Sequence, residues 1–241
     1  MGRIYRSPWE DFPDVVVQTT VARLQAQPSY RAAKQGDHEA AREALGPLIK
    51  PDKVPWGFDA VVPVAQLDRD HQNALPFVYA YALADHRGAA VLTAVKQDNV
   101  VSHTGADART RVLAQPTFKG DAQPGLRVLI VDDVVSFGAT LANLRGWLER
   151  QGAVVVGATT LAATYGGTKL KPPEAALDAL RERFPRVREL ARTLGFKPEC
   201  FTAREAHYLR GLKQEGELDR LIKLGREMHR GRGWSRGHFL A

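Results

Sequence analysis

The stretch Arg127-Val-Leu-Ile-Val-Asp-Asp-Val-Val-Ser-Phe-Gly-Ala-Thr-Leu141 decides the fold of this 241-residue chain. Its apolar run, residues 128–131, predicts a strand buried on both faces, as strands of parallel sheets are. Two adjacent carboxylates, Asp132 and Asp133, end the run, and a loop of small residues leads into a helix pattern at Leu141. In an open α/β sheet, ligands bind at the carboxyl ends of the strands. The stretch therefore predicts a binding site at a strand end.

The loop between strand and helix has the composition of an anion site. It leads into a helix N-terminus, where free backbone N–H groups and the positive end of the helix dipole favour negative charge. Consecutive N–H groups in a turn form a nest for an anion, and glycine permits the positive φ that such a turn needs. The two carboxylates can accept hydrogen bonds from hydroxyl groups. Together these features predict a ligand with both hydroxyls and phosphate, a sugar phosphate. The loop residues are Ser136, Phe137, Gly138, Ala139 and Thr140.

This layout resembles the motif that binds phosphoribosyl pyrophosphate in type I phosphoribosyltransferases. The resemblance implies that Asp132 and Asp133 contact the ribose hydroxyls and help to hold Mg²⁺ through water, a cation that prefers oxygen ligands and keeps much of its hydration. It also implies that residues 136–140 bind the 5′-phosphate. The reaction would then be displacement of pyrophosphate from the sugar by a nitrogen acceptor, a nucleobase, whose identity the sequence does not specify.

Two flanking segments extend the resemblance over residues 57–165. One looks like the loop that contacts pyrophosphate through its backbone: Val64, Ala65, Gln66, Leu67, Asp68 and Arg69. The segment 96–118 resembles the lid that closes over pyrophosphate, with Lys96, His103, Arg109 and Arg111 as candidate contacts. For each cation an ordinary solvated loop charge is an equal alternative. No general base is identifiable; His103 could act as one, but an ordinary solvated loop histidine is the favoured interpretation. The spacing of Gln97, Arg109, Arg111 and Phe118 is most similar to the ComF-like subgroup.

Two positions depart from the family pattern. Phe137 stands where members usually have Thr or Ser, so one phosphate-facing hydroxyl is missing. Ser136 stands where the hypoxanthine–guanine enzymes have an Asp, and a hydroxyl cannot replace that carboxylate in proton transfer near neutral pH. A 6-oxopurine salvage enzyme is therefore disfavoured.

The central stretch has two other interpretations. Receiver domains of two-component signalling also contain Val-Leu-Ile-Val-Asp-Asp, but their acidic pair lies near the domain start and their phosphoacceptor Asp ends a later strand. In this chain the next aspartate, Asp178, lies in a helical pattern. The other alternative is a plain structural turn. A short motif stays a hypothesis until its strand–loop–helix context is seen.

Strand and helix patterns alternate through the middle of the chain, which predicts a parallel α/β sheet. Strands are expected at 58–64, 89–95, 127–131 and 153–158, and helices at 73–85 and 140–151. The region 96–125 is expected to be a long loop with a short strand near 112–118. We expect a type I phosphoribosyltransferase-like sheet flanked by helices over residues 56–165. Helical additions precede it (1–55) and follow it (166–241), forming an acceptor-recognising hood or a dimer interface.

The charge is concentrated in the C-terminal part. Residues 166–241 hold 17 basic and 10 acidic residues, which accounts for the whole net charge of +7. This favours an acidic partner, including nucleic acid, although a solvated basic helical face explains it equally well. A helix over 217–229 with Leu218, Leu221, Ile222 and Leu224 on one face is expected to pack on the core or a partner subunit. The tail 230–238 is expected to be loose.

Composition excludes several classes of protein. No apolar window is long enough for a transmembrane helix, and a single cysteine, Cys200, fits a reducing cytoplasm. No metal-binding histidine pattern, Gly-x-Ser-x-Gly elbow or P-loop is present. The sequence thus favours a cytoplasmic, Mg²⁺-dependent phosphoribosyltransferase. The alternative is a non-catalytic regulator that binds phosphoribosyl pyrophosphate and acts on a nucleic acid or protein partner.

Overall fold

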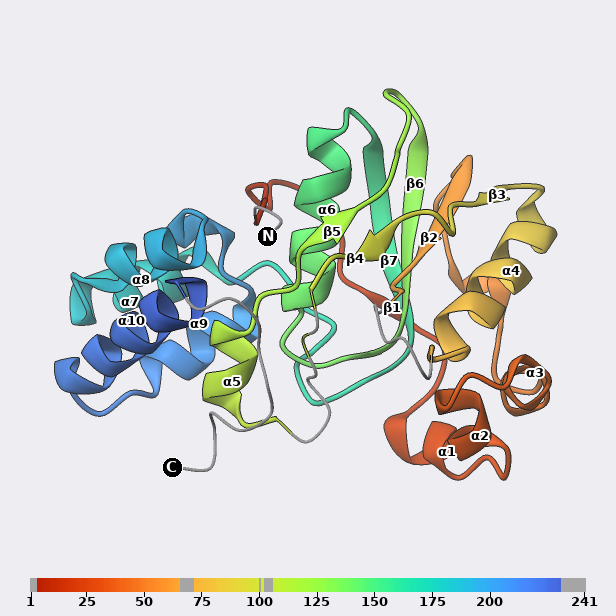
Figure 1. The fold of residues 1–241 in the computed structure, drawn as a ribbon, viewed down its shortest axis with the longest axis horizontal. Helices are drawn as coiled ribbons and strands as arrows, with labels where there is room; N and C mark the ends of the chain where they lie inside the picture. Colours follow the sequence, from red (N-terminus) through yellow and green to blue (C-terminus); the bar gives the residue numbers. More distant parts are fainter. Residues whose placement is uncertain (1–3, 66–71, 100, 102–105, 231–241) are drawn as a thin grey trace.

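A computed structural model of the protein describes residues 4–65, 72–99, 101 and 106–230. Its central sheet has five strands in the order β1-β7-β6-β2-β3, and all neighbouring strands run parallel (Figure 1). This confirms the α/β class that the alternating sequence pattern predicted. The strands are β1 (Val16–Val17), β2 (Ala60–Pro63), β3 (Ala90–Val91), β6 (Arg127–Val135) and β7 (Val154–Ala163). A separate antiparallel pair joins β4 (Lys96–Gln97) to β5 (Phe118–Lys119).

The order of the strands creates a switch point between β2 and β6. From β2 the chain passes through α4 (Leu75–Arg87) to β3, which pairs with β2 on the side away from β6. From β6 it passes through α6 (Ala139–Arg150) to β7, which pairs with β6 on the side away from β2. The two connections diverge from neighbouring strands, and ligands of open α/β sheets bind in the crevice at such a point. The segments that follow β2 and β6 are the two that the sequence associated with pyrophosphate and phosphate.

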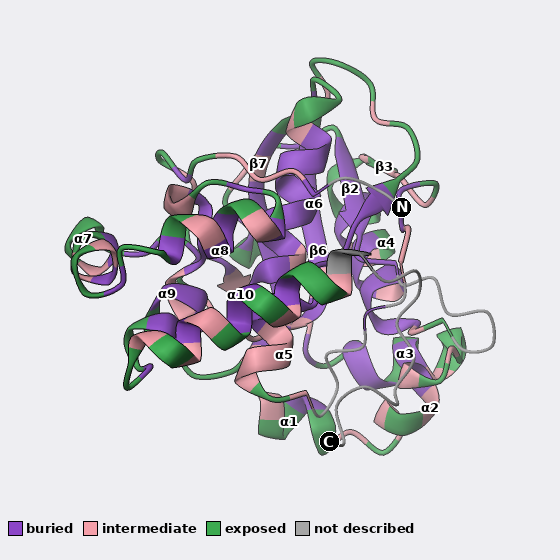
Figure 2. Cartoon of the chain, turned by 60° about the vertical axis from the view of Figure 1, so that its left-hand side comes forward, coloured by how far each residue is buried: buried purple, intermediate pink, exposed green. Residues whose placement is uncertain are grey.

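Strand β6 is buried on both faces because a helix covers each one. Side chains alternate along a strand, so Leu129 and Val131 pack in the cluster that includes Leu83 of α4. Val128 and Ile130 pack in the cluster that includes Leu148 of α6. Figure 2 shows the central strands β2 and β6 and most of α6 buried. The first half of β6 is therefore packed from both sides.

The N-terminal part packs beside α4 and also contributes to the sheet. Its helices are α1 (Val21–Gln25), α2 (Tyr30–Lys34) and α3 (His38–Leu45), and a 3₁₀ turn, η1 (Pro51–Lys53), follows. Asp37 caps α3 by accepting hydrogen bonds from the backbone N–H groups of Glu39 and Ala40. Residues 1–55 are not helical throughout, because β1 pairs with β7 at the sheet edge.

The C-terminal part forms a helical bundle with a hydrophobic core of its own (Figure 1). It contains α7 (Glu174–Arg183), α8 (Val187–Leu194), η2 (Pro198–Cys200), α9 (Ala203–Arg210) and α10 (Glu215–Arg230). The expected capping box is present: Thr202 and Glu205 exchange hydrogen bonds at the start of α9. The face of α10 that carries Leu218 and Leu221 packs into the bundle core. No helix in the described ranges is long and apolar enough to cross a bilayer.

The region 96–125 differs from the sequence prediction. Residues 108–113 form a helix, α5 (Ala108–Leu113), where part of a short strand was expected, and the strand that does form, β5, covers two residues. Asp107 caps α5 by accepting a 2.7 Å hydrogen bond from the N–H of Thr110. Val112 and Leu113 are buried in the core of the C-terminal bundle. This contact with a distant part of the chain stabilises the helix. A local sequence pattern could not reveal it.

Candidate functional site

The two carboxylates lie within strand β6 and not beyond its end. The strand continues to Val135, and Asp132 is in register with Thr160 of β7. Asp132 is half-buried, whereas Asp133 is only 7% exposed. Because successive side chains point to opposite faces of a sheet, the two carboxylates have different surroundings. They cannot be equivalent contacts to a ligand.

Asp133 is held by two residues that nothing in the sequence pattern singles out. The ammonium of Lys34, at the end of α2, donates a 2.5 Å hydrogen bond to its Oδ2 atom, and Asn73 Nδ2 donates to the same oxygen at 3.0 Å. Burial opposes ionisation of Asp133, but the charge and hydrogen bond of Lys34, together with hydrogen bonds from Asn73 and the Val134 N–H, outweigh burial and lower its pKa. Asp133 is therefore an ionised group whose Oδ2 atom already has protein partners.

Asp132 has the opposite electrostatic environment. Burial, reinforced by the negative charge of Asp133, raises its pKa well above the usual value. Its Oδ1 atom accepts the backbone N–H of Asp133 at 2.8 Å, and within the described ranges no Lys or Arg side chain forms an ion pair with it. Asp132 lines a small cavity next to the loop. Of the two carboxylates, it is the more exposed one and the one that lines this cavity.

The loop 136–140 forms the turn that the sequence predicted. Gly138 has φ +80° and directly precedes α6. A side chain on Gly138 would meet the Leu170 side chain at 2.4 Å, so both the conformation and the space require glycine. The cavity beside the loop has a volume of about 60 Å³ and includes the five loop residues, Asp132 and Arg111 in its lining. The loop, a carboxylate and a guanidinium thus converge at the switch point.

Phe137 anchors this loop to the C-terminal bundle. Its carbonyl accepts a 2.6 Å hydrogen bond from the Thr202 hydroxyl at the start of α9. Its ring meets Tyr208 edge-on at 6.4 Å between centroids, and the Arg204 guanidinium lies 5.5 Å from the ring centroid. Phe137 therefore has a packing role, a contact between the loop and α9.

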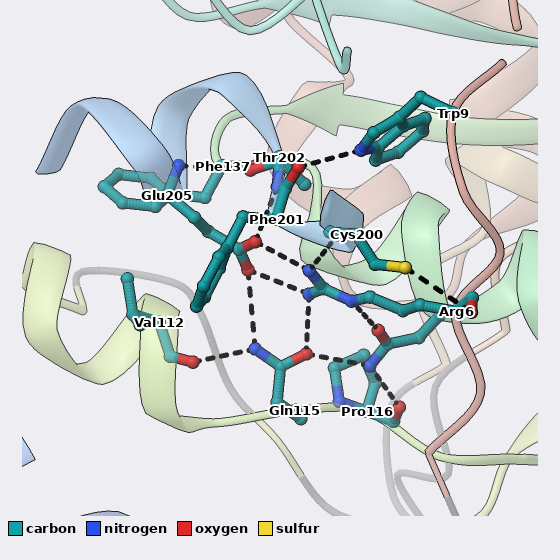
Figure 3. Close-up of polar contacts among 11 residues, drawn as sticks. Arg6, Trp9, Val112, Gln115, Pro116, Phe137, Cys200, Phe201, Thr202 and Glu205 are labelled. Atoms are coloured by element: carbon teal, nitrogen blue, oxygen red, sulfur yellow. Dashed lines mark hydrogen bonds and ion pairs between the residues drawn. The ribbon is translucent and has the colours of Figure 1, made fainter. Parts of the chain in front are cut away.

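A buried polar network ties the start of the chain to the same region (Figure 3). The Arg6 guanidinium donates to both carboxylate oxygens of Glu205 on α9, at 2.6 and 2.8 Å, and both side chains are at most 1% exposed. It also donates to Gln115, which follows α5, and to Asn143 on α6. One guanidinium therefore links the N-terminal segment, α6, the segment after α5 and the C-terminal bundle.

Gly146 of α6 gives the N-terminal segment room to pass. A Cβ at this position would lie 2.5 Å from the carbonyl oxygen of Tyr5 and 2.6 Å from the Cα of Arg6. Only a residue without a side chain lets the backbone at residues 5–6 lie directly on the helix. This close approach places the Arg6 side chain within reach of its partners.

The segment after β2 is described only in part. The N–H of Val64 donates to the carbonyl of Val131 at 2.8 Å, and the carbonyl of Ala65 accepts the N–H of Gln97 at 2.9 Å. These contacts place the start of the predicted pyrophosphate loop beside Val131, the residue of β6 that precedes Asp132. The other predicted members of this loop, Gln66, Leu67, Asp68 and Arg69, lie outside the described residues.

The candidate lid cations do not act as one group. Arg111 lines the small cavity, and its pKa is lowered by burial. Arg109 lines a second, larger cavity and lies 3.7 Å from Asp107. Lys96 is exposed on β4 and lines neither cavity. His103, the remaining candidate, lies outside the described residues. Arg111 is thus the lid residue that the fold brings to the loop.

The larger cavity adjoins the loop through Phe137, which lines both. It has a volume of about 810 Å³ and lies between α5, the loop 136–140, α9 and α10. Its lining combines aromatic side chains, leucines and several cations. Within the described part of the chain, no group of three or more His, Cys, Asp or Glu residues has the arrangement of a metal site.

Comparison with known proteins adds partial similarities. No protein-family model matches the chain. It is 35% identical to protein TraN of Escherichia coli over 218 residues, which cover 87% of this chain and 49% of TraN. It therefore spans about half the length of that relative. It is 27% identical to the adenine phosphoribosyltransferase of Dichelobacter nodosus over 118 residues, covering 44% of this chain and 68% of that enzyme.

The fold was also compared with solved structures. The adenine phosphoribosyltransferase of Rhodothermus marinus aligns with 68% of this chain, and the match covers 83% of that structure. The sequence identity is 23% and the TM-score is 0.35.

Proposed function

We propose that this chain is a Mg²⁺-dependent phosphoribosyltransferase that uses phosphoribosyl pyrophosphate and a nitrogen acceptor, a nucleobase. The observation that carries the proposal is the convergence of Asp132, Arg111 and the loop 136–140 around one cavity at the switch point of the sheet. The similarity to an adenine phosphoribosyltransferase over 118 residues supports the same activity. The spacing of Gln97, Arg109, Arg111 and Phe118 makes ComF-like proteins the expected subgroup.

The loop supplies the donors for the 5′-phosphate. The N–H groups from Ser136 to Thr140 precede α6 or lie in its first turn, where intrahelical acceptors are lacking. They can therefore bind an anion. Arg111, on the wall of the same cavity, adds a fixed positive charge. Because one helix N-terminus contributes only about 0.3–2 kcal/mol to an anion, several donors must act together.

Asp132 is the residue that we assign to Mg²⁺ and to the ribose hydroxyls. It has no cationic partner among the described residues and lines the cavity, which suits a cation bound by one or two carboxylates and by substrate oxygens. Asp133 already has Lys34 and Asn73 at its Oδ2 atom. We therefore assign it to orienting the strand end and to a ribose contact through its remaining lone pairs. Mg²⁺ would neutralise charge on the pyrophosphate.

The proposed reaction forms one bond and breaks one. A nitrogen of the acceptor attacks C1 of the sugar, and the C1–O bond breaks. Pyrophosphate leaves with the electron pair of that bond, and the acceptor's proton passes to solvent. The cationic side chains stabilise the charge that grows on the leaving group. We assign residues 56–165 to the catalytic core, and the additions over 1–55 and 166–241 to its support and to the acceptor site.

The test is release of pyrophosphate. The protein is mixed with phosphoribosyl pyrophosphate, Mg²⁺ and a panel of nucleobases, and pyrophosphate is measured with time. Release that depends on one base, and that falls by at least tenfold in Asp132→Asn and in Asp133→Asn, is expected. Asp121→Asn is the control, because this exposed aspartate lies outside both cavities. If calorimetry detects no binding of phosphoribosyl pyrophosphate to the folded protein, the proposal is wrong.

A second candidate function is a regulator that binds phosphoribosyl pyrophosphate without turnover and acts on a nucleic acid or protein partner. The pairing of Asp133 with Lys34 favours it, because it occupies one carboxylate oxygen at the sugar position. Tight binding without pyrophosphate release for any acceptor would support the regulator. Salt-sensitive binding to DNA or RNA would then identify a nucleic acid as its partner.

A further inference from the structure

The large cavity carries a strong excess of positive charge. Of its lining residues, five are Lys or Arg and two are Glu. Its cations come from four different segments (α5, α9, the α9–α10 connection and α10), so the excess is not the exposed face of one helix: Arg109, Arg204, Lys213, Arg220 and Lys223. Among the described residues, four of these five form no ion pair, the exception being Arg109 with Asp107. Cations that meet across a cavity repel one another unless an anion lies between them.

Two of these guanidinium groups have a buried donor without an acceptor. The Nε atoms of Arg109 and Arg204 are inaccessible to solvent and have no hydrogen-bond partner. Buried polar atoms in folded proteins are almost always paired with protein, water or a bound ion. Both arginines line this cavity. Two arginines of this lining therefore each have a donor that no acceptor among the described residues satisfies.

The remaining walls favour a flat, apolar ring. Phe137 and Tyr208 stand edge to face, and Leu212, Leu221 and Leu224 complete the apolar lining. Ligand sites typically combine such an apolar lining with a few polar groups that fix orientation. Phe137 also lines the small cavity of the phosphate loop. A ring in the large cavity would therefore lie next to the proposed sugar site.

We infer that the acceptor of this protein is a heteroaromatic ring that carries an anionic group, a carboxylate or a phosphate. The ring contacts Phe137 and Tyr208, and the anion pairs with the cations of α9 and α10. That the ring is the acceptor of the reaction rests on the proposed function. The binding of an aromatic anion in this cavity is independent of that function. A neutral nucleobase would leave the cavity's excess positive charge uncompensated.

The experiment compares the same ring with and without an anionic group. Calorimetry measures binding to the full chain with phosphoribosyl pyrophosphate and Mg²⁺ present, so that the phosphate loop is occupied. The pairs are orotate with uracil, nicotinate with nicotinamide, and adenosine 3′-monophosphate with adenosine. We expect the anion of at least one pair to bind at least tenfold more tightly than its neutral partner. The carboxylate and phosphate pairs then distinguish the two sources of the anion.

Variants locate the site. Arg220→Gln/Lys223→Gln changes two exposed residues of α10, and Arg204→Gln removes one unpaired donor. Each is expected to abolish the preference for the anion. For Arg220→Gln/Lys223→Gln, which lies away from the loop 136–140, the affinity for phosphoribosyl pyrophosphate is expected to stay unchanged. Arg192→Gln is the matched control, because it removes the same charge from exposed α8 outside the cavity.

Three results would overturn the inference. One is equal affinity for the charged and neutral members of every pair. Another is an anion preference that survives in both cavity variants. The third is a single-stranded oligonucleotide that binds far more tightly than any of the small anions and is displaced by none, since it would assign the cavity to nucleic acid. Failure of phosphoribosyl pyrophosphate to bind would count against the proposed function alone, because the ring pairs can also be compared in its absence.

Discussion

The Nζ atom of Lys34 lies 2.5 Å from Oδ2 of Asp133, so the last residue of α2 neutralises a carboxylate of strand β6. The two residues are 99 positions apart in the chain. The Asp133 side chain is 10% exposed and that of Lys34 is 34% exposed. The N-terminal helices therefore contribute directly to the electrostatics of the proposed sugar site, and several consequences can be measured.

Replacing Lys34 by Met should destabilise the protein and raise the pKa of Asp133. The carboxylate keeps its bond from Asn73 but loses its cation, and an under-satisfied buried group costs about 1–3 kcal/mol. The lowered pKa of Asp133 contributes stability that is lost as pH falls below 3.8, the ordinary pKa of an aspartate, and through the folded-state value. The variant should therefore lose less stability than the wild type over that acidic range. Urea unfolding at several pH values measures both effects. Arg31→Met, an exposed change on the same helix, should have neither.

Breaking the Arg6–Glu205 pair should cost far more than breaking a surface pair. Removing one partner of a buried ion pair typically costs about 3–5 kcal/mol, because the other charge stays buried. We expect this cost for Arg6→Met and for Glu205→Gln, and a double variant that costs less than the sum of the two. A double-mutant cycle by chemical denaturation measures the coupling. Strict additivity would show that the two side chains do not interact.

Gly146→Ala should destabilise the protein even though alanine is the better helix former by about 1 kcal/mol. The new methyl group would lie 2.5 Å from the Tyr5 carbonyl and would displace the segment that carries Arg6. Gly216→Ala on α10 meets nothing within 4 Å and should be neutral or stabilising. Thermal unfolding of both variants tests the contact. Equal melting temperatures would contradict the close packing of residues 5–6 on α6.

The free energy of unfolding should fall at high pH because Tyr79 ionises more readily in the unfolded state. Burial raises the pKa of Tyr79 from 10.0 to about 12. Below pH 10 both folded and unfolded states keep the proton; between pH 10 and 12 only the folded state does, so ionisation favours unfolding by about 3 kcal/mol in total. Tyr79→Phe should be less stable at pH 8, because it removes the partner of Gln18 and Thr159, and should lack this part of the pH dependence. Tyr81→Phe, an exposed change, is the control.

Local sequence was sufficient for the elements whose signals are local. The apolar run before Asp132 predicted the central strand, and Thr202 with Glu205 predicted the start of α9. Gly138 marked the turn before α6 because a positive φ there requires glycine. These features depend on hydrogen bonds and side chains within a few residues of one another, which a sequence displays directly.

Tertiary contacts decided what the sequence could not show. Asp132 and Asp133 are alike in the sequence, yet only the fold brings Lys34 to one of them and leaves the other with a raised pKa. Residues 112–113 favoured a strand by composition, but packing in the C-terminal core makes them the end of α5. A charged residue near the N-terminus gives no sign of a partner 199 positions away.

The separation of 199 positions between Arg6 and Glu205 also affects folding during synthesis. Ribosomes add about 5–20 residues per second, so Arg6 leaves the ribosome roughly 10–40 s before Glu205 exists. During synthesis its guanidinium must remain in water or with temporary partners, and the N-terminal segment cannot settle on α6 in its final form. The contact between the first residues and α9 therefore forms only after the chain has been made through Glu205.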